Sequence, residues 1–279
     1  MKILVCGAGG MLGHDLMSAA AAAGHDVVGT DRPLLDVTDA EAVRGALASA
    51  RPDAVLNCAA WTKVDDAEDE PEEAMRVNGE GAGNVAAAAA EVGAGVLYLS
   101  TDYVFDGTKR QPYVESDPPS PLSVYGRTKL AGEQKTVAVN ERSLVVRSSW
   151  LFGIHGGNFV DTMLRLGRER DELRVVHDQV GCPTWTGHLA DALVSLTDGG
   201  EYGIRHLAGG GQCSWCDFAR EIFRQAGIAC QVHPITTAEY PLPAPRPAYS
   251  VLRSTRGAEL PPWQEGLQRY LGEREALAA

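Results

Sequence analysis

The chain has 279 residues, of which 44% are hydrophobic and 22% charged, with a formal net charge of −12. This composition is typical of a folded globular protein and excludes global disorder, and the acidic surplus argues against broad nucleic-acid binding, which requires clusters of Lys and Arg. No apolar run is long enough to cross a bilayer, and the start "MKILVCGAGG" has no signal-peptide cleavage pattern, so we expect a cytoplasmic protein.

The first half of the chain alternates between short apolar runs and helical patterns. The runs that predict strands occupy residues 2–6, 26–30, 53–58, 95–100 and 143–149. Between them, helices are predicted within residues 11–23, 39–50, 72–92 and 123–139. Short apolar runs separated by amphipathic helices are typical of a parallel sheet covered on both faces. The sequence therefore predicts a doubly wound α/β domain of the Rossmann type.

In the second half of the chain, strands and helices are no longer predicted in regular alternation. Strands are predicted at 172–176 and 203–210, and helices near 159–170 and 186–196, after Cys213 and after Pro262. The proline-rich stretch 240–247 interrupts regular structure. We expect residues 1–150 to form an NAD(P)-binding Rossmann domain and residues 151–279 mainly a smaller substrate-binding lobe. Segments near 174–197 and 230–237 are predicted to return to the main domain and extend its sheet.

A glycine-rich turn joins the first predicted strand to the first predicted helix. Gly7, Gly10 and Gly13 have the spacing G-x-x-G-x-x-G. Gly7 allows the tight turn, Gly10 the approach of a pyrophosphate and Gly13 close packing of the helix, while free amides face the phosphates. The turn, together with Met11 and Leu12, is therefore a predicted dinucleotide-binding site.

Residues at the ends of the next strands complete the predicted cofactor site. Asp31 stands where a carboxylate that binds the adenosine ribose of NADH is expected, whereas the neighbouring Arg32 suits the 2′-phosphate of NADPH. The sequence does not choose between the two cofactors. Further contacts are predicted for two residues beside the adenine and three at the end of the third strand: Asp36, Val37, Asn57, Ala59 and Ala60.

The candidate chemistry lies after the fourth strand. Ser100 and Thr101 end that strand, at the edge where open parallel sheets bind ligands, and a hydroxyl there donates a hydrogen bond to a substrate carbonyl. In "SVYGRTK", Tyr125 and Lys129 share one face of a predicted helix, and a neighbouring ammonium is expected to lower the pKa of the phenol. Together with a dinucleotide loop, these groups predict reduction of a ketone, with a hydride from nicotinamide and a proton from Tyr125.

The sequence predicts no metal site. The six cysteines are scattered, and Cys213 and Cys216 have no second pair or nearby His at zinc spacing, so reduced thiols are expected. The carboxylates of residues 64–73 favour the amino-terminal end of a helix. Val64 and Asp65, nearest to the preceding strand, are expected to face the substrate.

Longer motifs resemble those of a known family. They include "GAGGMLG", "LSTDYVFDG", "PLSVYGRTKLAGE", "VVRSSWLFG", "NFVDTMLRL", "VHDQVGCPT" and "YPLPAPRP". Over nearly its whole length the chain resembles the extended short-chain dehydrogenase/reductases and, among them, the dTDP-4-dehydrorhamnose reductases. The resemblance implies that NADPH or NADH reduces dTDP-4-dehydro-L-rhamnose, a dTDP-linked 4-keto-6-deoxy sugar, to dTDP-L-rhamnose.

The resemblance also implies roles for single residues. Thr101, Tyr125 and Lys129 would form the catalytic set, with Lys129 also holding the nicotinamide ribose. Contacts with the substrate, its sugar or its diphosphate are implied for Asp102, Trp150, Asn158 and Arg246.

Some family members bind magnesium at a dimer interface through acidic side chains. The matching positions here are Asp15, Gly187 and Pro262, of which only the first is a carboxylate, so we expect a monomer or a dimer that magnesium does not bridge. Two other functions stay open. A reductase or epimerase of another nucleotide-linked 4-keto sugar would keep the same catalytic residues, and a non-catalytic, NADP-binding regulatory subunit would not need them intact.

Overall fold

A six-stranded parallel sheet forms the centre of the fold. A computed structural model describes residues 1–32, 34–257 and 259–278. The strand order is β10-β5-β4-β3-β1-β2, which confirms the predicted doubly wound sheet. The direction of winding changes between β1 and β3, and such switch points bind ligands. The strands are β1 (Lys2–Cys6), β2 (Asp26–Thr30), β3 (Ala54–Asn57), β4 (Gly95–Thr101), β5 (Ser143–Ser148) and β10 (Gly203–His206).

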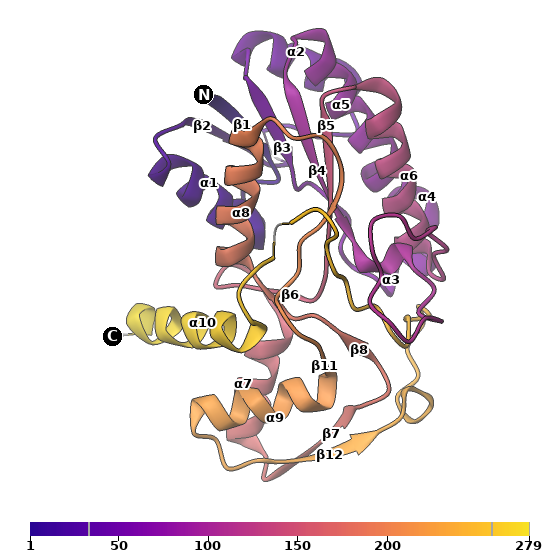
Figure 1. The fold of residues 1–279 in the computed structure, drawn as a ribbon, viewed down its shortest axis with the longest axis vertical. Coiled ribbons are helices and arrows are strands. Elements are labelled where there is room, and N and C mark those ends of the chain that lie inside the picture. The colour runs from indigo at the N-terminus through magenta and orange to yellow at the C-terminus, as the bar shows by residue number, and fades with distance from the viewer. Residues whose placement is uncertain (33, 258, 279) are drawn as a thin grey trace.

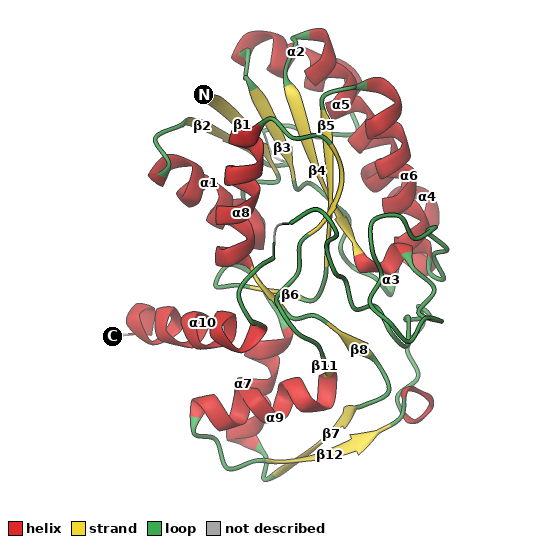
Figure 2. Ribbon diagram, in the orientation of Figure 1, coloured by secondary structure: helices red, strands yellow, loops and turns green. Residues whose placement is uncertain are grey.

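Helices cover both faces of this sheet (Figures 1 and 2). One face carries α1 (Met11–Ala22) and α8 (Thr186–Gly199), and the other carries α2 (Ala40–Ala50), α5 (Ala82–Glu91) and α6 (Val124–Val139). The burial of β1 shows why the sheet needs helices on both faces. Ile3 and Val5 pack into the core below α1 and α8, whereas Leu4 and Cys6 pack into the core below α2 and α5. An uninterrupted apolar strand is thereby buried on both sides.

The sequence predicts one helix within residues 72–92. The structure instead has α5 preceded by three short elements. They are α3 (Asp66–Asp69), α4 (Pro71–Met75) and the π-helical turn η1 (Arg76–Gly81). A π turn takes an extra residue into the helix and rotates the side chains that follow. The helical pattern is therefore correct here, but the turn within it is not visible in the sequence.

The second lobe, in the lower part of Figure 1, has its own core of aromatic side chains, including Phe152, Phe218 and Tyr270. Its helices are α7 (Phe159–Glu169), α9 (Trp215–Ala226) and α10 (Trp263–Ala278). Its strands pair as β6 (Leu151–Phe152) with β9 (Thr184–Trp185), β7 (Glu172–Val176) with β12 (Gln231–Ile235), and β8 (Val180–Gly181) with β11 (Cys213–Ser214).

The segments that were expected to return to the main domain behave differently from one another. α8 packs against α1, so this part of the first segment returns to the main domain. β10, which lies outside the segments expected to return, extends the main sheet beside β5. β7 and β12 instead pair with each other in the small lobe, so the predicted return is wrong for residues 174–176 and 230–237. Side chains of β7 alternate between exposed and buried, because α9 covers one face, whereas the main sheet buries strands on both faces.

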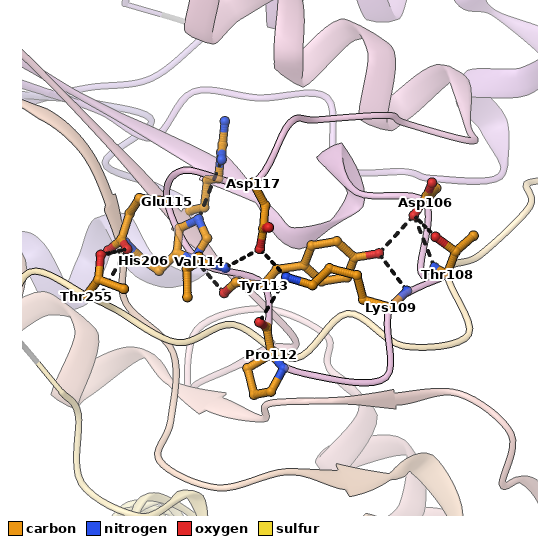
Figure 3. Close-up of polar contacts among 11 residues, drawn as sticks. Asp106, Thr108, Lys109, Pro112, Tyr113, Val114, Glu115, Asp117, His206 and Thr255 are labelled. Atoms are coloured by element: carbon orange, nitrogen blue, oxygen red, sulfur yellow. Dashed lines mark hydrogen bonds and ion pairs between the residues drawn. The ribbon is translucent and has the colours of Figure 1, made fainter.

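The loop between β4 and α6 carries Glu115, which joins three segments of the chain (Figure 3). Its carboxylate accepts hydrogen bonds from the N–H of Thr255 at 2.9 Å, the hydroxyl of Ser254 at 2.7 Å and the N–H of His206 at 3.1 Å. These bonds hold the loop against β10 and against the segment that leads to α10. The loop connects Thr101 to Tyr125 along the chain, so its anchoring supports the candidate site.

Replacing Glu115 by Gln should weaken the fold at neutral pH but not in acid. Burial raises the pKa of Glu115, but hydrogen bonds from Thr255, Ser254 and His206 outweigh it and lower the pKa from 4.5 to about 2. Such a carboxylate stabilises the fold above its unfolded pKa and loses this contribution as the pH falls through its folded pKa. The urea midpoint of the variant should therefore lie below that of the unmodified chain at neutral pH, and the difference should close between about pH 4.5 and 2. An equal difference at every pH would contradict this explanation.

Candidate active site

A cavity of about 950 Å³ lies between the carboxyl ends of the sheet strands and Trp215 of the small lobe. Residues from the glycine-rich turn, from the ends of β2, β3 and β4, and from the start of α6 line it. The predicted site residues all line this cavity except Asn57, Asp65, Asn158 and Arg246. The structure therefore brings the candidate cofactor residues and the set of Thr101, Tyr125 and Lys129 into one space.

The glycine-rich turn has the shape that a pyrophosphate requires. Gly7 has a φ of 79°, and a Cβ on Gly13 would lie 2.1 Å from the carbonyl oxygen of Gly7. Gly10, the N-cap of α1, offers no side-chain acceptor to the first amides of the helix. Amides at a helix start that lack such an acceptor bind anions. The residues present therefore fit a dinucleotide.

Acidic and basic side chains follow the turn along the cavity edge. A Cβ on Gly9 would lie 3.0 Å from Oδ2 of Asp31, so this carboxylate stands beside the turn, with Arg32 next to it. Asp36 instead accepts hydrogen bonds from the N–H and hydroxyl of Thr38, at 2.9 and 2.8 Å, and these bonds lower its pKa. Asp36 therefore shapes the wall, whereas Asp31 and Arg32 are available for a ribose or its 2′-phosphate.

The start of α6 brings Tyr125 to the cavity. Ser123 caps the helix by accepting a hydrogen bond from the N–H of Gly126 at 3.1 Å. A Cβ on Gly126 would lie 2.3 Å from the carbonyl oxygen of Tyr103, so close packing against the 3-10 turn η2 (Asp102–Val104) requires glycine there. This packing places Tyr125 beside the end of β4.

Lys129 is buried against β4. Its ammonium donates a hydrogen bond to the carbonyl oxygen of Leu99 at 2.7 Å and lies 4.1 Å from the centre of the Tyr98 ring. Burial lowers the pKa of Lys129 to about 7, while Cys58 and Glu133 oppose this shift. The protonated and neutral forms of Lys129 are therefore both accessible near neutral pH.

The expected lowering of the pKa of Tyr125 is wrong for this structure. Burial raises its pKa to about 12, and the side chain of Thr101 offsets this only in part. The ammonium of Lys129 is directed to the Leu99 carbonyl. Tyr125 is consequently protonated at neutral pH, which is the form that a proton donor needs.

Thr101 is oriented by the turn that follows it. Its hydroxyl donates to Oδ1 of Asp102 at 3.1 Å and accepts the N–H of Tyr103 at 3.2 Å. Asp102 is buried, accepts a second hydrogen bond from the hydroxyl of Ser250, and has its pKa raised to about 6 by burial. Thr101 and Asp102 therefore present a fixed polar edge to the cavity.

Two stacked indoles form the wall on the side of the small lobe. The rings of Trp150 and Trp215 are 3.5 Å apart and nearly parallel, at 5°. Trp150 has a φ of 49°, which is uncommon for a bulky residue, and a Cβ on Gly181 would lie 2.5 Å from its ring. Strained backbone of this kind persists where the surrounding packing holds it, often at binding sites.

Arg246 and Asp65 bind each other outside the cavity wall. The guanidinium of Arg246 donates to both carboxylate oxygens of Asp65, at 3.0 and 2.8 Å. A partly buried guanidinium takes such a bidentate partner when one is within reach. The two residues therefore stabilise the join between the proline-rich stretch and the segment after β3, and the structure does not place them among the groups that face the cavity.

Asn158 and Asn57 also have local partners. Asn158 caps α7 by accepting a hydrogen bond from the N–H of Asp161 at 3.0 Å, and it lines a separate hollow between α7 and α10. Asn57 accepts the N–H of Ala59 at 3.2 Å at the end of β3. Both amides thus organise the backbone near the cavity.

Among the residues near the cavity that the sequence did not predict are Trp215 and Asn78. Trp215 begins α9 and lines the wall, but its neighbourhood in the sequence indicates only a helix start. Asn78 lies in η1. Its side chain accepts a hydrogen bond from the N–H of Trp61 at 2.8 Å and donates one to the hydroxyl of Thr128 at 3.0 Å. It thereby ties the segment after β3 to α6. A π turn inside an ordinary helical pattern leaves no signal by which it could have been found.

The described residues hold no group of three or more His, Cys, Asp or Glu side chains placed to bind a metal ion. The six cysteines are free thiols. Within the same part of the chain, none of the helices has the length and apolar character needed to span a membrane.

Known proteins resemble this chain over nearly its full length. The family described as the RmlD substrate binding domain matches residues 1–275. A dTDP-4-dehydrorhamnose reductase of Mycolicibacterium smegmatis is 47% identical over 276 residues, which are 96% of this chain and 84% of the relative. A crystal structure of a dTDP-4-dehydrorhamnose reductase from Clostridium acetobutylicum has a TM-score of 0.96 and 45% identity, and covers 99% of this chain and 100% of its own. The Bacillus anthracis dTDP-4-dehydrorhamnose reductase in complex with NADP has a TM-score of 0.95 and 40% identity, and covers 98% and 99%.

Proposed function

The chain belongs to the RmlD substrate binding domain family, and from this membership we propose that it reduces the 4-keto group of dTDP-4-dehydro-L-rhamnose to give dTDP-L-rhamnose. NADPH or NADH is the reductant. The observation that carries the proposal is the single cavity that joins the glycine-rich turn to Thr101, Tyr125 and Lys129. A reductase needs a dinucleotide and a proton donor in one space, and this cavity contains groups suited to both.

The turn of Gly7, Gly10 and Gly13 would hold the pyrophosphate of the dinucleotide, and Asp31 or Arg32 its adenosine ribose. When bound, the reduced nicotinamide supplies a hydride to the keto carbon. The residues of the chain then serve to place the substrate carbonyl and to neutralise the charge that develops on its oxygen.

Tyr125 donates the proton to that oxygen. The alkoxide left by hydride addition is a stronger base than a phenolate, so transfer from a phenol whose pKa is about 12 is favourable. The hydroxyl of Thr101, whose oxygen accepts the N–H of Tyr103, turns its one proton from Asp102 to donate a hydrogen bond to the same oxygen when the substrate binds. Lys129, one helical turn beyond Tyr125 and hydrogen-bonded to Leu99, would in its protonated form stabilise the remaining phenolate by its charge and not by a hydrogen bond.

Trp150 and Val64 both line the cavity, and Trp150 provides a wall against which the sugar binds. Of the positions at which related proteins would bind magnesium, Gly187 and Pro262 have no carboxylate. The proposal therefore includes a monomer, or a dimer that magnesium does not bridge.

The test supplies purified protein with dTDP-4-dehydrorhamnose and either NADPH or NADH, and follows oxidation of the nicotinamide. We expect consumption of at least one cofactor and formation of dTDP-L-rhamnose. Parallel reactions with other nucleotide-linked 4-keto sugars separate the proposal from a reductase or epimerase of a different substrate. If no sugar is turned over but NADP binds, the chain is a binding protein and the proposal fails.

A further inference from the structure

A buried ion pair lies behind the cavity, one helical turn beyond Lys129. The carboxylate of Glu133 accepts hydrogen bonds from Nε and Nη2 of Arg147, at 2.9 and 2.7 Å, and from the hydroxyl of Ser100. The side chains of Glu133 and Arg147 are only 4% and 2% exposed. Neither the phosphate turn nor the proton donor uses this pair.

Burial of an ion pair is costly, and apolar side chains of similar volume often replace such pairs without loss of stability. The location of this pair suggests what it does. Glu133 binds Ser100, whose neighbours in β4 are Leu99, the acceptor of the Lys129 ammonium, and Thr101. The carboxylate of Glu133 therefore holds the strand segment on which both catalytic contacts depend.

The surroundings of Lys129 show why a nearby negative charge matters. The ammonium contacts a neutral carbonyl oxygen and the face of the Tyr98 ring, and among the residues that the structure describes no ion-pair partner of Lys129 is found. Burial favours the neutral amine, and Glu133 opposes this effect. The other titratable or charged groups around Lys129 and Glu133 are Cys58 after β3, Tyr98 on β4, Tyr125 on α6, Arg147 on β5 and His206 on β10.

We propose that Glu133, anchored by Arg147, is a positioning residue that keeps Lys129 protonated and its Leu99 acceptor in place. The kinetic consequence rests on the proposed function, because it assumes that Lys129 assists proton transfer from Tyr125. The charge state of Lys129 itself does not depend on that assumption, so it can be measured without substrate.

The direct test is a pH titration of protein labelled with ¹³C at the lysine ε-carbons. The chain has five lysines, at positions 2, 63, 109, 129 and 135, so the resonance of Lys129 can be assigned by its loss in Lys129→Met. We expect Lys129 in the unmodified chain to titrate near pH 7, well below the ordinary lysine pKa of 10.5. In Glu133→Gln, the midpoint should move to lower pH by about one unit.

A matched control keeps this result specific. Glu80→Gln removes the carboxylate of η1 that pairs at the surface with Lys135 of α6, and it should leave the midpoint of Lys129 unchanged. If Glu133→Gln is unstable because Arg147 is left unpaired, the double variant Glu133→Met with Arg147→Met removes both buried charges. That variant should fold and should still show a lower midpoint.

The kinetic test uses the pH profile of kcat. The alkaline limb should move to lower pH in Glu133→Gln, by about the same amount as the Lys129 midpoint, while KM for NADPH changes less than about threefold. An unchanged Lys129 midpoint in a folded variant would overturn the proposal and leave the pair a purely structural one. A shifted midpoint in a chain that turns over no nucleotide sugar would instead uphold the proposal for Lys129 and reject the proposed function.

Discussion

Replacement of Tyr125 by Phe should lower kcat by about 10²- to 10⁴-fold, the usual contribution of general acid catalysis. The change deletes one hydroxyl and leaves the ring in its cluster with Val124, Ala67 and Trp61. The fold and the glycine-rich turn should therefore be intact. We expect the dissociation constant of NADPH, measured by calorimetry, to change less than about threefold while nicotinamide oxidation nearly ceases.

Tyr103→Phe is the matched control for this experiment. The Tyr103 ring packs edge-on against Tyr125, with 5.5 Å between ring centres, and also lines the cavity. The Tyr103→Phe variant also loses a phenolic hydroxyl from a side chain that lines the cavity. Tyr103 has no assigned part in proton transfer, so kcat should fall by less than about tenfold. A rate for Tyr125→Phe equal to that of the unmodified chain would remove Tyr125 from its role as proton donor.

Replacement of Gly13 by Ala should have the second large effect, on cofactor binding. The new Cβ would lie 2.1 Å from the carbonyl oxygen of Gly7 and 2.8 Å from Cα of Ala8, so backbone atoms must move. Overpacking of this kind costs about 1–3 kcal/mol, and the movement displaces the amides that face the phosphates. We expect a lower urea midpoint and at least a tenfold weaker affinity for NADPH by calorimetry, since about 1.4 kcal/mol corresponds to a factor of ten.

Gly45→Ala provides the comparison, because Gly45 lies inside α2 and a Cβ there has no atom within 4 Å. Alanine is the better helix former by about 1 kcal/mol, so this variant should be slightly more stable and should bind NADPH unchanged. Normal NADPH affinity in Gly13→Ala would show that the turn tolerates displacement and that its close packing is not needed for the cofactor.

The secondary structure could be predicted closely because burial patterns are local. The predicted helix at 11–23 is α1 (Met11–Ala22), and the one at 123–139 is α6 (Val124–Val139). Pairing between distant strands has no such local signal. The error over β7 and β12 arose because a short apolar strand has the same composition whether it joins a large sheet or a pair of its own.

In the candidate site, too, residues that a local sequence pattern reveals differ from residues whose surroundings depend on distant parts of the chain. Residues directly at strand ends or in the glycine-rich turn were predictable, because the carboxyl edge of a parallel sheet collects them. The sequence could not show that the guanidinium of Arg246 pairs with Asp65, 181 positions away, and the expected contact of Arg246 with a nucleotide diphosphate stays a prediction. The pKa of Tyr125 also escaped prediction, since it depends on burial and on where the ammonium of Lys129 points.

The sequence by itself determined the doubly wound sheet and the glycine-rich turn, and it indicated Thr101, Tyr125 and Lys129 as the candidate reacting side chains, because each is encoded over a few neighbouring residues. Only the tertiary structure decided which charges remain free and which are neutralised. Glu133 meets Arg147 and Ser100, and Trp150 stacks on Trp215, only after distant segments have packed together. Desolvation and charge pairing are properties of that packed arrangement, and they set the protonation states on which the chemistry depends.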